Sequence, residues 1–321
     1  MTGVVHKSIE NPSPAAILRK GVRQRLKPMR KLSRAIVESQ DAEALHDLRV
    51  ASRRLRTALL LMGSFVSHRH IKPIARRLKQ LTRALGLPRE LDVHVEHLNR
   101  LHENLGAVEA SAAAEFLLER VAERRAREHR EMLKALKSLP IVKLQKDIQA
   151  LTRRLPRREV SGGVGRSGDE ILAPLIEHAF AGLSALRQTE RPEDLHQMRI
   201  AVKRLRYALE WIAPTARGGF ASVIHRAVAL QDCIGRHHDA TQLLRLIENV
   251  KEELIGRGRT ALAEGLQHCR DTVAMERDQH YAEFLAMTQQ MTASAIHRDV
   301  RSALEFAERR ATIAKLRRVG T

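Results

Sequence analysis

The sequence predicts an all-α protein made of two pseudo-symmetric four-helix bundles that derive from an internal duplication. Three observations support this prediction. One helical pattern occurs twice, apolar residues recur at helical spacing along most of the chain, and no segment shows the sustained alternation of a β-strand. Helices of this kind bury their apolar stripes against one another, which favours bundles.

The repeated pattern covers 45–59 and occurs again at 195–209, with Leu, His, Arg, Ala, Arg, Leu, Arg, Ala and Leu at the same offsets. At about 100° per residue, the basic side chains fall within one narrow arc of a helix. The roughly opposite arc of the first copy is apolar and contains Leu48, Ala51, Leu55, Ala58, Leu59 and Met62. Each copy therefore has one face for a core and one cationic face.

The cationic face of the first copy lacks acidic partners. No carboxylate lies four residues before or after Arg49, Arg53 or Arg56, which is the spacing of helical ion pairs. A solvated basic face is the simplest interpretation of one such helix. Because the duplication repeats the particular order His, Arg, Arg or Lys, Arg, an external anion explains the pattern better. A face about 15 Å long suits an extended polyanion.

The remaining elements of the first half follow from local signals. Pro28 is expected to kink the first helix, and Asp41 is expected to cap the motif helix. Pro88 is expected to end the helix that precedes it, and Pro140 is expected to separate the last two helices of this half. The expected helices cover 14–39, 41–63, 71–85, a segment from 89 onward, 107–139 and 141–155.

The second half repeats this plan after a linker rich in glycine and proline. Pro192 and the acidic residues after it are expected to open the second motif helix, and Pro214 to close it. The other expected helices cover 168–188, 219–234, 236–255, 258–289 and 292–318. The predicted organisation is a first bundle over 12–155, a linker over 156–167 and a second bundle over 168–319.

Composition restricts the class of partner. The 321 residues include 57 Lys and Arg against 37 Asp and Glu, a formal net charge of +20, which favours nucleic acid, an inorganic phosphate polymer or an acidic membrane surface. Aromatic residues make up only 3%, which argues against single-stranded nucleic-acid readers that stack bases. Two cysteines and the lack of a long apolar run predict a cytoplasmic protein without a disulfide framework or a membrane span.

The two motif helices resemble those of the CHAD family, which is named for histidines in an α-helical domain. Each copy precedes a Leu-Gly or Ile-Gly helix end, at Gly86 and Gly235, and the resemblance covers about 12–318. It implies that both bundles form one CHAD domain, with basic residues around a central cavity that binds inorganic polyphosphate. Glu90 departs from the family, where Asp more often follows the arginine.

The resemblance carries the family's binding positions onto both motif helices. Arg54 and Arg204 are secondary positions, together with Arg77 and Arg226, which align when the repeat is extended. The predicted polyphosphate-binding residues are His46, Arg49, Arg53, Arg54, Arg56, Arg77, His196, Arg199, Lys203, Arg204, Arg206 and Arg226. Arginine suits phosphate because its planar fork donates two parallel hydrogen bonds. An adjacent anion also favours protonated histidine, so binding is expected to strengthen toward pH 6.

The predicted protein is not an enzyme and uses no cofactor or metal. Its expected partner is polyphosphate, at polyphosphate granules or beside a separate triphosphate-processing enzyme, since the Glu-x-Glu-x-Lys signature of such an enzyme is absent from this chain. A general polyanion or nucleic-acid binder is the alternative, because duplex phosphates would also bind these arginines. Nucleic acid is otherwise expected only as a non-specific competitor, since no helix-turn-helix or zinc-finger pattern occurs.

Histidine pairs raise two metal hypotheses, and both are weak. His46-Asp47 and His238-Asp239 resemble ligands of metal-dependent phosphohydrolases, but Gln197 replaces Asp47 in the second copy. His94 and His97 share a helix face, yet no third zinc ligand is evident, so they are interpreted as a surface pair.

Overall fold

The structure is a computed structural model that describes the chain except for residues 1–12, 105–107, 157–162, 216–218 and 320–321. The described residues form helices joined by short turns and contain no strand. The helices of the first half are α1 (Pro14–Leu26), α2 (Met29–Ser39), α3 (Ala42–Met62), α4 (His68–Ala84), α5 (Leu87–Asn104), α6 (Val108–Ser138) and α7 (Ile141–Arg153). Those of the second half are α8 (Gly163–Phe180), α9 (Leu183–Gln188), α10 (Pro192–Ile212), α11 (Ala221–Gly256), α12 (Thr260–Gln290) and α13 (Ala293–Val319), with a 3-10 turn η1 (Ala213–Thr215) after α10. The all-α class is confirmed.

Several predicted helix boundaries agree with the structure. The first helix breaks at Pro28, which separates α1 from α2. The Asp41 side chain accepts a hydrogen bond of 2.9 Å from the backbone N–H of Ala44, so it caps the motif helix α3 as expected. Pro192 occupies the first turn of α10, where its missing N–H leaves no bond unmade.

The predicted helix end at Gly235 is wrong, because α11 continues through it to Gly256. In the first copy, Pro88 follows Gly86 closely, and α5 begins as a new helix there. No proline follows Gly235, so the backbone hydrogen bonds of α11 can continue. The predicted helix over 168–188 is also wrong: α8 begins at Gly163 and ends at Phe180, and α9 follows separately.

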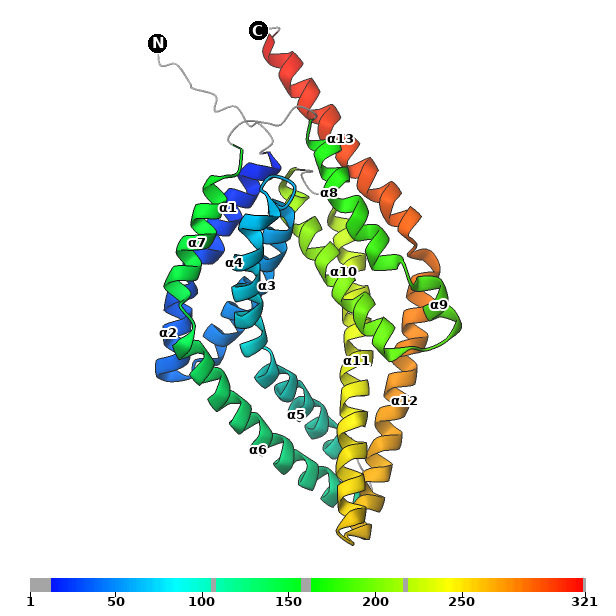
Figure 1. Ribbon diagram of the computed structural model, residues 1–321. Coiled ribbons are helices and arrows are strands. Elements are labelled where there is room, and N and C mark those ends of the chain that lie inside the picture. The colour runs from blue at the N-terminus through cyan, green and yellow to red at the C-terminus, as the bar shows by residue number, and fades with distance from the viewer. Residues whose placement is uncertain (1–12, 105–107, 157–162, 216–218, 320–321) are drawn as a thin grey trace, which may run out of the picture.

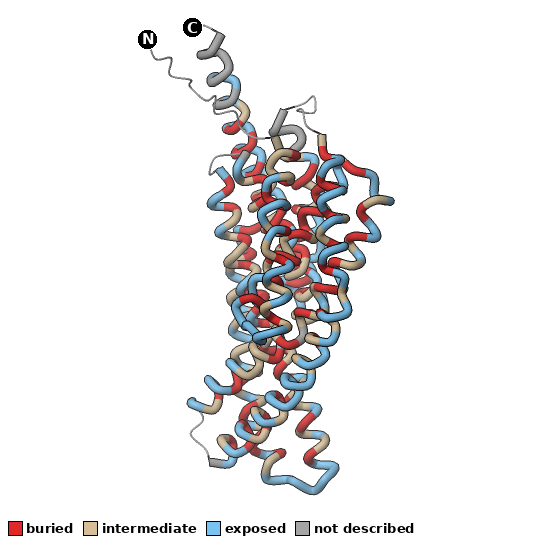
Figure 2. Tube along the Cα trace, turned by 90° about the vertical axis from the view of Figure 1, so that its left-hand side faces the viewer, coloured by how far each residue is buried: buried red, intermediate tan, exposed pale blue. Residues whose placement is uncertain are grey.

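The two halves of the chain interlock (Figure 1). Helices α1–α4 and α7 lie on one side, and α8–α10 and α13 lie on the other with the neighbouring ends of α11 and α12. Helices α5 and α6 run diagonally from the first side and pack against the far ends of α11 and α12. Figure 2 shows buried residues on the inward sides of the helices and exposed residues outside.

Two hydrophobic cores result from this arrangement. The larger core contains side chains of both halves, such as Leu55 of α3 and Leu205 of α10, each at most 2% exposed. The smaller core joins Leu98 and Leu117, of α5 and α6, with Leu243 of α11 and side chains of α12. The cores thus cross the two halves of the sequence. The domain boundary at 156–167 stays a prediction, and half of that segment, 157–162, lies outside the described residues.

Trp211 fixes α10 against the first half. A Cβ atom at Gly21 of α1 would lie 2.3 Å from the Trp211 ring, so the glycine allows this close approach. The Trp211 indole Nε1 donates a hydrogen bond of 3.3 Å to the backbone oxygen of Arg54 in α3, and the Arg25 guanidinium lies over the ring at 4.4 Å. One side chain therefore holds α10 against both α1 and α3.

None of the described helices combines the length and the apolar character that crossing a membrane requires.

Candidate functional site

The two repeated helices, α3 and α10, bury their apolar arcs and leave their cationic arcs outside the core. Leu48, Leu55, Ala58 and Met62 are fully buried in α3, as the helical pattern predicts. The helices pack near their C-terminal ends, where the Arg54 guanidinium lies 3.3 Å from the Glu210 carboxylate. Toward their N-terminal ends they diverge (Figure 1).

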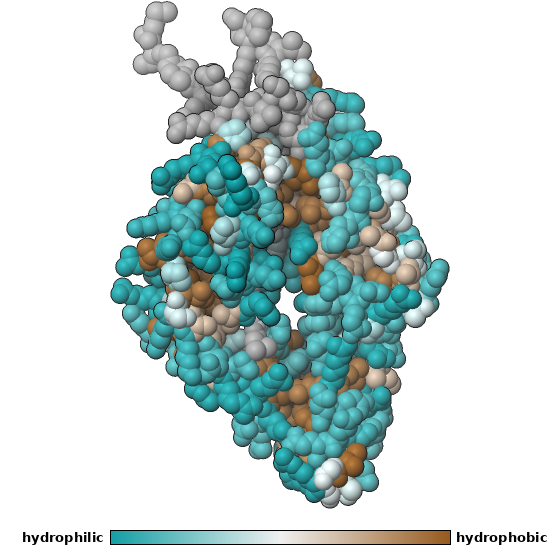
Figure 3. Space-filling model, viewed as in Figure 1, coloured by the Kyte–Doolittle hydropathy of each residue, from teal (hydrophilic) through white to brown (hydrophobic). Residues whose placement is uncertain are grey.

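A central opening passes through the molecule where these helices diverge. Figure 3 shows this opening bordered mainly by hydrophilic surface. In the same view, α3 lies on one side, α10 and α11 lie on the other, and α5 lies below. The opening therefore lies between the two motif helices.

Basic side chains of the two helices share one electrostatic environment. The charge of Arg53 in α3 acts on Lys203 of α10, and the charge of Arg204 in α10 acts on Arg56 of α3. Burial is the largest cause that lowers the pKa of Lys203 to about 7, followed by Arg199 and Arg53. Cations of both copies therefore lie near one another, although they come from distant parts of the sequence.

These cations lack partners of opposite charge. Among the described residues, six basic side chains of the two motif helices form no ion pair with a carboxylate: Arg49, Arg53, Arg56, Arg199, Lys203 and Arg204. The Nε atoms of Arg49 and Arg199 are buried and have no hydrogen-bond partner. Burial, Arg53 and Arg89 lower the pKa of Arg49 to about 10. Because unpaired buried donors and clustered cations both cost free energy, the arrangement favours a bound anion.

Two carboxylates lie within this field of cations, Glu90 of α5 and Asp239 of α11. Neither forms an ion pair with a described residue, and burial raises the pKa of both against the opposing effect of Arg199. The charge of Asp239 also acts on Glu90, so these carboxylates from different halves lie near one another. They supply negative charge among the cations without neutralising any one of them directly.

The two motif histidines occupy different surroundings. The His46 side chain is exposed, whereas His196 stacks on His238 of α11 with ring centroids 4.3 Å apart. The Nδ1 atom of His196 is buried without a partner. Burial and nearby cations lower the pKa of His196, and burial with His196 and Arg199 lowers that of His238 to about 3. The stacked pair is therefore neutral at pH 7.

The family model for the CHAD domain matches residues 20–248, which include both motif helices. The chain belongs to the CHAD family. Its structure is similar to the crystal structure of the CHAD domain from the plant Ricinus communis, with a TM-score of 0.63 and 20% sequence identity over 91% of this chain and 98% of that one. It is also similar to PptA from Streptomyces chartreusis, with a TM-score of 0.63 and 19% identity over 87% of this chain and 99% of that one. Among curated protein sequences, none matches this chain.

Not every residue predicted from the CHAD motif belongs to the unpaired cluster. Arg54 and Arg206 both bind Glu210, which follows Arg206 by one helical turn. The first copy has the exposed Leu60 in place of Glu210, so the lack of acidic partners noted for the first copy does not extend to the second. Arg54 therefore links α3 to α10, whereas Arg206 pairs within α10.

Arg77 and Arg226, the secondary positions, bind carboxylates on neighbouring helices. Arg77 of α4 donates a hydrogen bond of 2.6 Å to Asp147 of α7. Arg226 of α11 forms the matching ion pair with Asp299 of α13. The two contacts occupy equivalent positions in this CHAD chain, and their role here is to join helices.

The interpretation of His94 and His97 as a surface pair is wrong. His97 is only 8% exposed, and its Nε2 atom lies 2.6 Å from a Glu276 oxygen of α12. Burial, with His97 and Arg124, lowers the pKa of His94 to about 4. The described residues contain no group of three or more His, Cys, Asp or Glu that could hold a metal ion.

Sequence reasoning missed the site residues outside the motif, namely Glu90, His238 and Asp239 as neighbours of the cations. Arg89-Glu90 and His238-Asp239 occupy equivalent places after Gly86 and Gly235. That equivalence was visible in the sequence and is the signal that could have identified them.

Proposed function

We propose that this CHAD protein binds inorganic polyphosphate at the opening between α3 and α10. The observation that carries the proposal is the set of six unpaired cations contributed by the two repeated helices. The resemblance of the motif to CHAD proteins that bind polyphosphate supports the same ligand. The site consists of Arg49, Arg53, Arg56, Arg199, Lys203 and Arg204, with His46 and His196 at its margin.

Polyphosphate matches these side chains chemically. Each phosphoryl unit carries a charge and oxygen atoms that accept hydrogen bonds, and the chain has no base that would need an aromatic platform. The buried Nε donors of Arg49 and Arg199 can bind phosphate oxygens, and an arginine fork can bind two at once. A flexible, thin chain can enter an opening that is bordered by helices on several sides.

We infer that the protein binds this chain without cleaving it. Arginine and lysine neutralise and position phosphate, whereas hydrolysis also needs an activated water and a group that accepts its proton. The charges of these cations act on Glu90 and Asp239. We assign them the role of limiting the positive charge before binding. Attachment to polyphosphate granules in the cytoplasm, or supply of chains to a triphosphate-processing enzyme, is the corresponding cellular role.

A competition experiment tests the proposed ligand. Labelled long-chain polyphosphate is displaced by duplex DNA, single-stranded RNA and pyrophosphate at about 0.15 M salt, where exposed charges are screened beyond about 8 Å. We expect nucleic acids and pyrophosphate to compete poorly. Equal competition by DNA or RNA would instead identify a general polyanion binder, a role that the net charge of +20 would favour.

The double variant Arg53→Glu with Lys203→Glu tests the location. We expect it to reduce polyphosphate affinity by about 100-fold or more, since both residues change sign at the centre of the cluster. The matched control is Lys72→Glu with Lys79→Glu, which makes the same charge change at two exposed residues of α4. Circular dichroism verifies that both variants remain helical. Equal affinity of the two variants would show that the site lies elsewhere.

A further inference from the structure

A basic pocket is lined entirely by residues of the first half of the chain. It encloses about 660 Å³ between the start of α3, the start of α5 and the middle of α6. Its walls carry four arginines, two histidines and a single carboxylate. The charged and titratable lining residues are His46, Arg49, Arg89, Asp92, Arg125, His129 and Arg130.

The positive charge of this pocket is only partly compensated. Asp92 forms ion pairs with both Arg89 and Arg125. Among the described residues, Arg49 and Arg130 have no carboxylate partner. Arg49 belongs to the pocket and also interacts with Arg53 of the central cluster. Arg49 therefore belongs both to the pocket and to the set of unpaired cations.

The sequence repeat identifies the corresponding place in the second half. Gln40 precedes its motif histidine by as many residues as Glu190 precedes the second one. In the same way, Pro88 follows Gly86 by as many residues as His237 follows Gly235. Asp147 pairs with Arg77 and Asp299 pairs with Arg226, so these two aspartates occupy equivalent positions. Their numbering gives the alignment of the later helices of the two halves. In that alignment, Arg125 corresponds to Arg277 and His129 to Tyr281.

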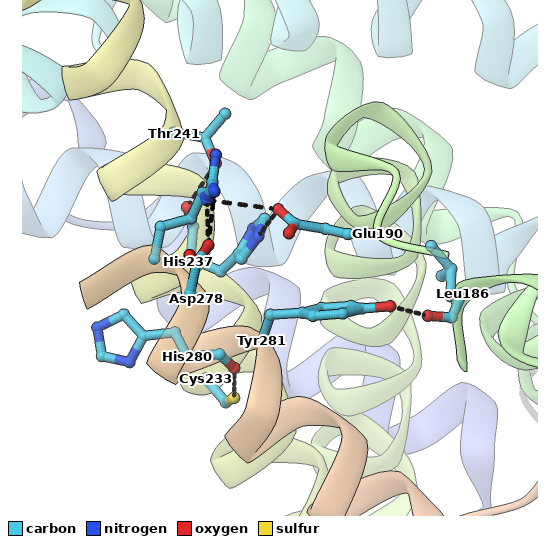
Figure 4. A network of polar contacts seen from close by, with 9 residues as sticks. Leu186, Glu190, Cys233, His237, Thr241, Asp278, His280 and Tyr281 are labelled. Atoms are coloured by element: carbon cyan, nitrogen blue, oxygen red, sulfur yellow. Dashed lines mark hydrogen bonds and ion pairs between the residues drawn. The ribbon is translucent and has the colours of Figure 1, made fainter. Parts of the chain in front are cut away.

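In the second half these positions form a closed polar network (Figure 4). Glu190 lies 2.8 Å from Nε2 of the buried His237 and 3.6 Å from Nε of Arg277. The Tyr281 hydroxyl donates a hydrogen bond of 2.6 Å to the backbone oxygen of Leu186, and its ring lies 6.2 Å from that of His237. In the second half, the Glu190 carboxylate thus lies where a bound anion would contact His237 and Arg277.

The first half lacks this internal carboxylate. Gln40 is neutral where Glu190 is charged, and Pro88 cannot supply the hydrogen bond that His237 makes. Arg125 borders the cavity and pairs with Asp92, at whose equivalent place the second half has Thr241. The difference between the halves leaves an open, cationic pocket whose counterpart is filled and neutralised.

We propose that this pocket is a one-sided phosphate subsite that binds the segment of a polyphosphate chain leaving the central opening past Arg49. This inference rests on the proposed function, because the same chain occupies both sites. Arg125 and Arg130 extend the binding surface onto α6, outside the repeated motif. Long chains then gain contacts that the second half cannot provide, and the chain exits preferentially on the side of the first half.

The double variant Arg125→Gln with Arg130→Gln tests the subsite. We expect about tenfold weaker binding of long-chain polyphosphate at about 0.15 M salt. The slope of log affinity against log salt should also fall by about 1.4, from roughly 0.7 for each lost phosphate contact. The matched control is Arg124→Gln with Arg127→Gln, which removes the same charge from exposed positions of the same helix outside the pocket.

A second variant tests the pocket without removing an arginine. Gln40→Glu places in the first half the carboxylate that Glu190 supplies in the second, and it should weaken long-chain binding several-fold by adding negative charge to the pocket. Gln149→Glu on the exposed face of α7 is its control. The melting temperature of each variant verifies that the fold is retained.

The outcomes separate this inference from the proposed function. Weaker binding by both pocket variants, with controls like the wild type, supports the subsite. If wild-type protein binds polyphosphate and the pocket variants match their controls, the subsite is refuted and the central site stands. If wild-type protein fails to bind polyphosphate, the proposed function and the subsite fall together.

Discussion

Lys203 of α10 lies within the electrostatic reach of Arg53 of α3, so the two copies of the repeated helix place cations beside each other. Burial, Arg199 and Arg53 together lower the pKa of Lys203 from its ordinary 10.5 to about 7. A protein without a bound anion therefore holds this group at the edge of deprotonation, and a bound phosphate would restore its charge.

The first prediction concerns stability of the free protein. Because the folded pKa of Lys203 lies below the unfolded value, the unfolded chain binds more protons between about pH 7 and 10.5, and this group makes stability rise with pH across that window. We expect Lys203→Met to raise the free energy of unfolding at pH 7 by about 1–3 kcal/mol, since one pKa unit is worth about 1.4 kcal/mol. Denaturant unfolding of ligand-free protein at pH 7 and pH 9 measures both effects. A destabilised Lys203→Met protein would contradict the prediction.

The second prediction concerns proton uptake on binding. Lys203, His196 and His238 have lowered pKa values in the free protein, and an anion among them would raise all three. Binding should therefore take up protons and strengthen as pH falls from about 8 to 6. Glu90 and Asp239 face the same site and become protonated at lower pH, which extends the effect in the same direction.

Calorimetric titration with polyphosphate at pH 7.5, in two buffers of different ionisation enthalpy, measures this uptake. The Lys203→Met variant should take up fewer protons than the wild type. Uptake that is zero in the wild type would show that these groups do not contact the ligand.

The third prediction concerns the carboxylates near the cations. Glu90→Gln removes a negative charge beside Arg199 and Arg49 without changing the side-chain shape, so polyphosphate affinity should rise about threefold to tenfold. Glu103→Gln, on an exposed part of α5, makes the same charge change away from the site. Affinities of the two variants at equal salt provide the measurement, and a gain of the same size in both would reflect net charge alone.

The fourth prediction concerns the contact that fixes α10 to α1. A Cβ atom at position 21 would lie 2.3 Å from the Trp211 ring, so Gly21→Ala should destabilise the fold by about 1–3 kcal/mol. Gly182→Ala is the control, because nothing lies within 4 Å of a Cβ atom there. Thermal unfolding distinguishes the two. A Gly21→Ala protein as stable as the control would show that Trp211 moves aside without cost.

Much of the fold follows from local patterns. The apolar arc of α3 and the Asp41 cap each depend on residues only a few positions apart, and the structure agrees with both. The kink predicted at Pro28 is a complete interruption between α1 and α2. The helix end expected at Gly235 is wrong, because a glycine alone only weakens a helix. At the equivalent Gly86, Pro88 also removes a backbone hydrogen bond.

The sequence by itself determined the helical class, the two basic helices and the residues on their cationic arcs, because helical periodicity assigns each side chain to a face. Only the tertiary structure decided which of these cations stay unpaired. Arg206 binds Glu210 within its own helix, but Arg54 reaches the same carboxylate from the other half of the chain, and Arg77 reaches Asp147 across a helix interface. Such partners depend on how distant segments pack, and the same packing leaves Arg49, Arg53, Arg199 and Lys203 without an ion pair among the described residues.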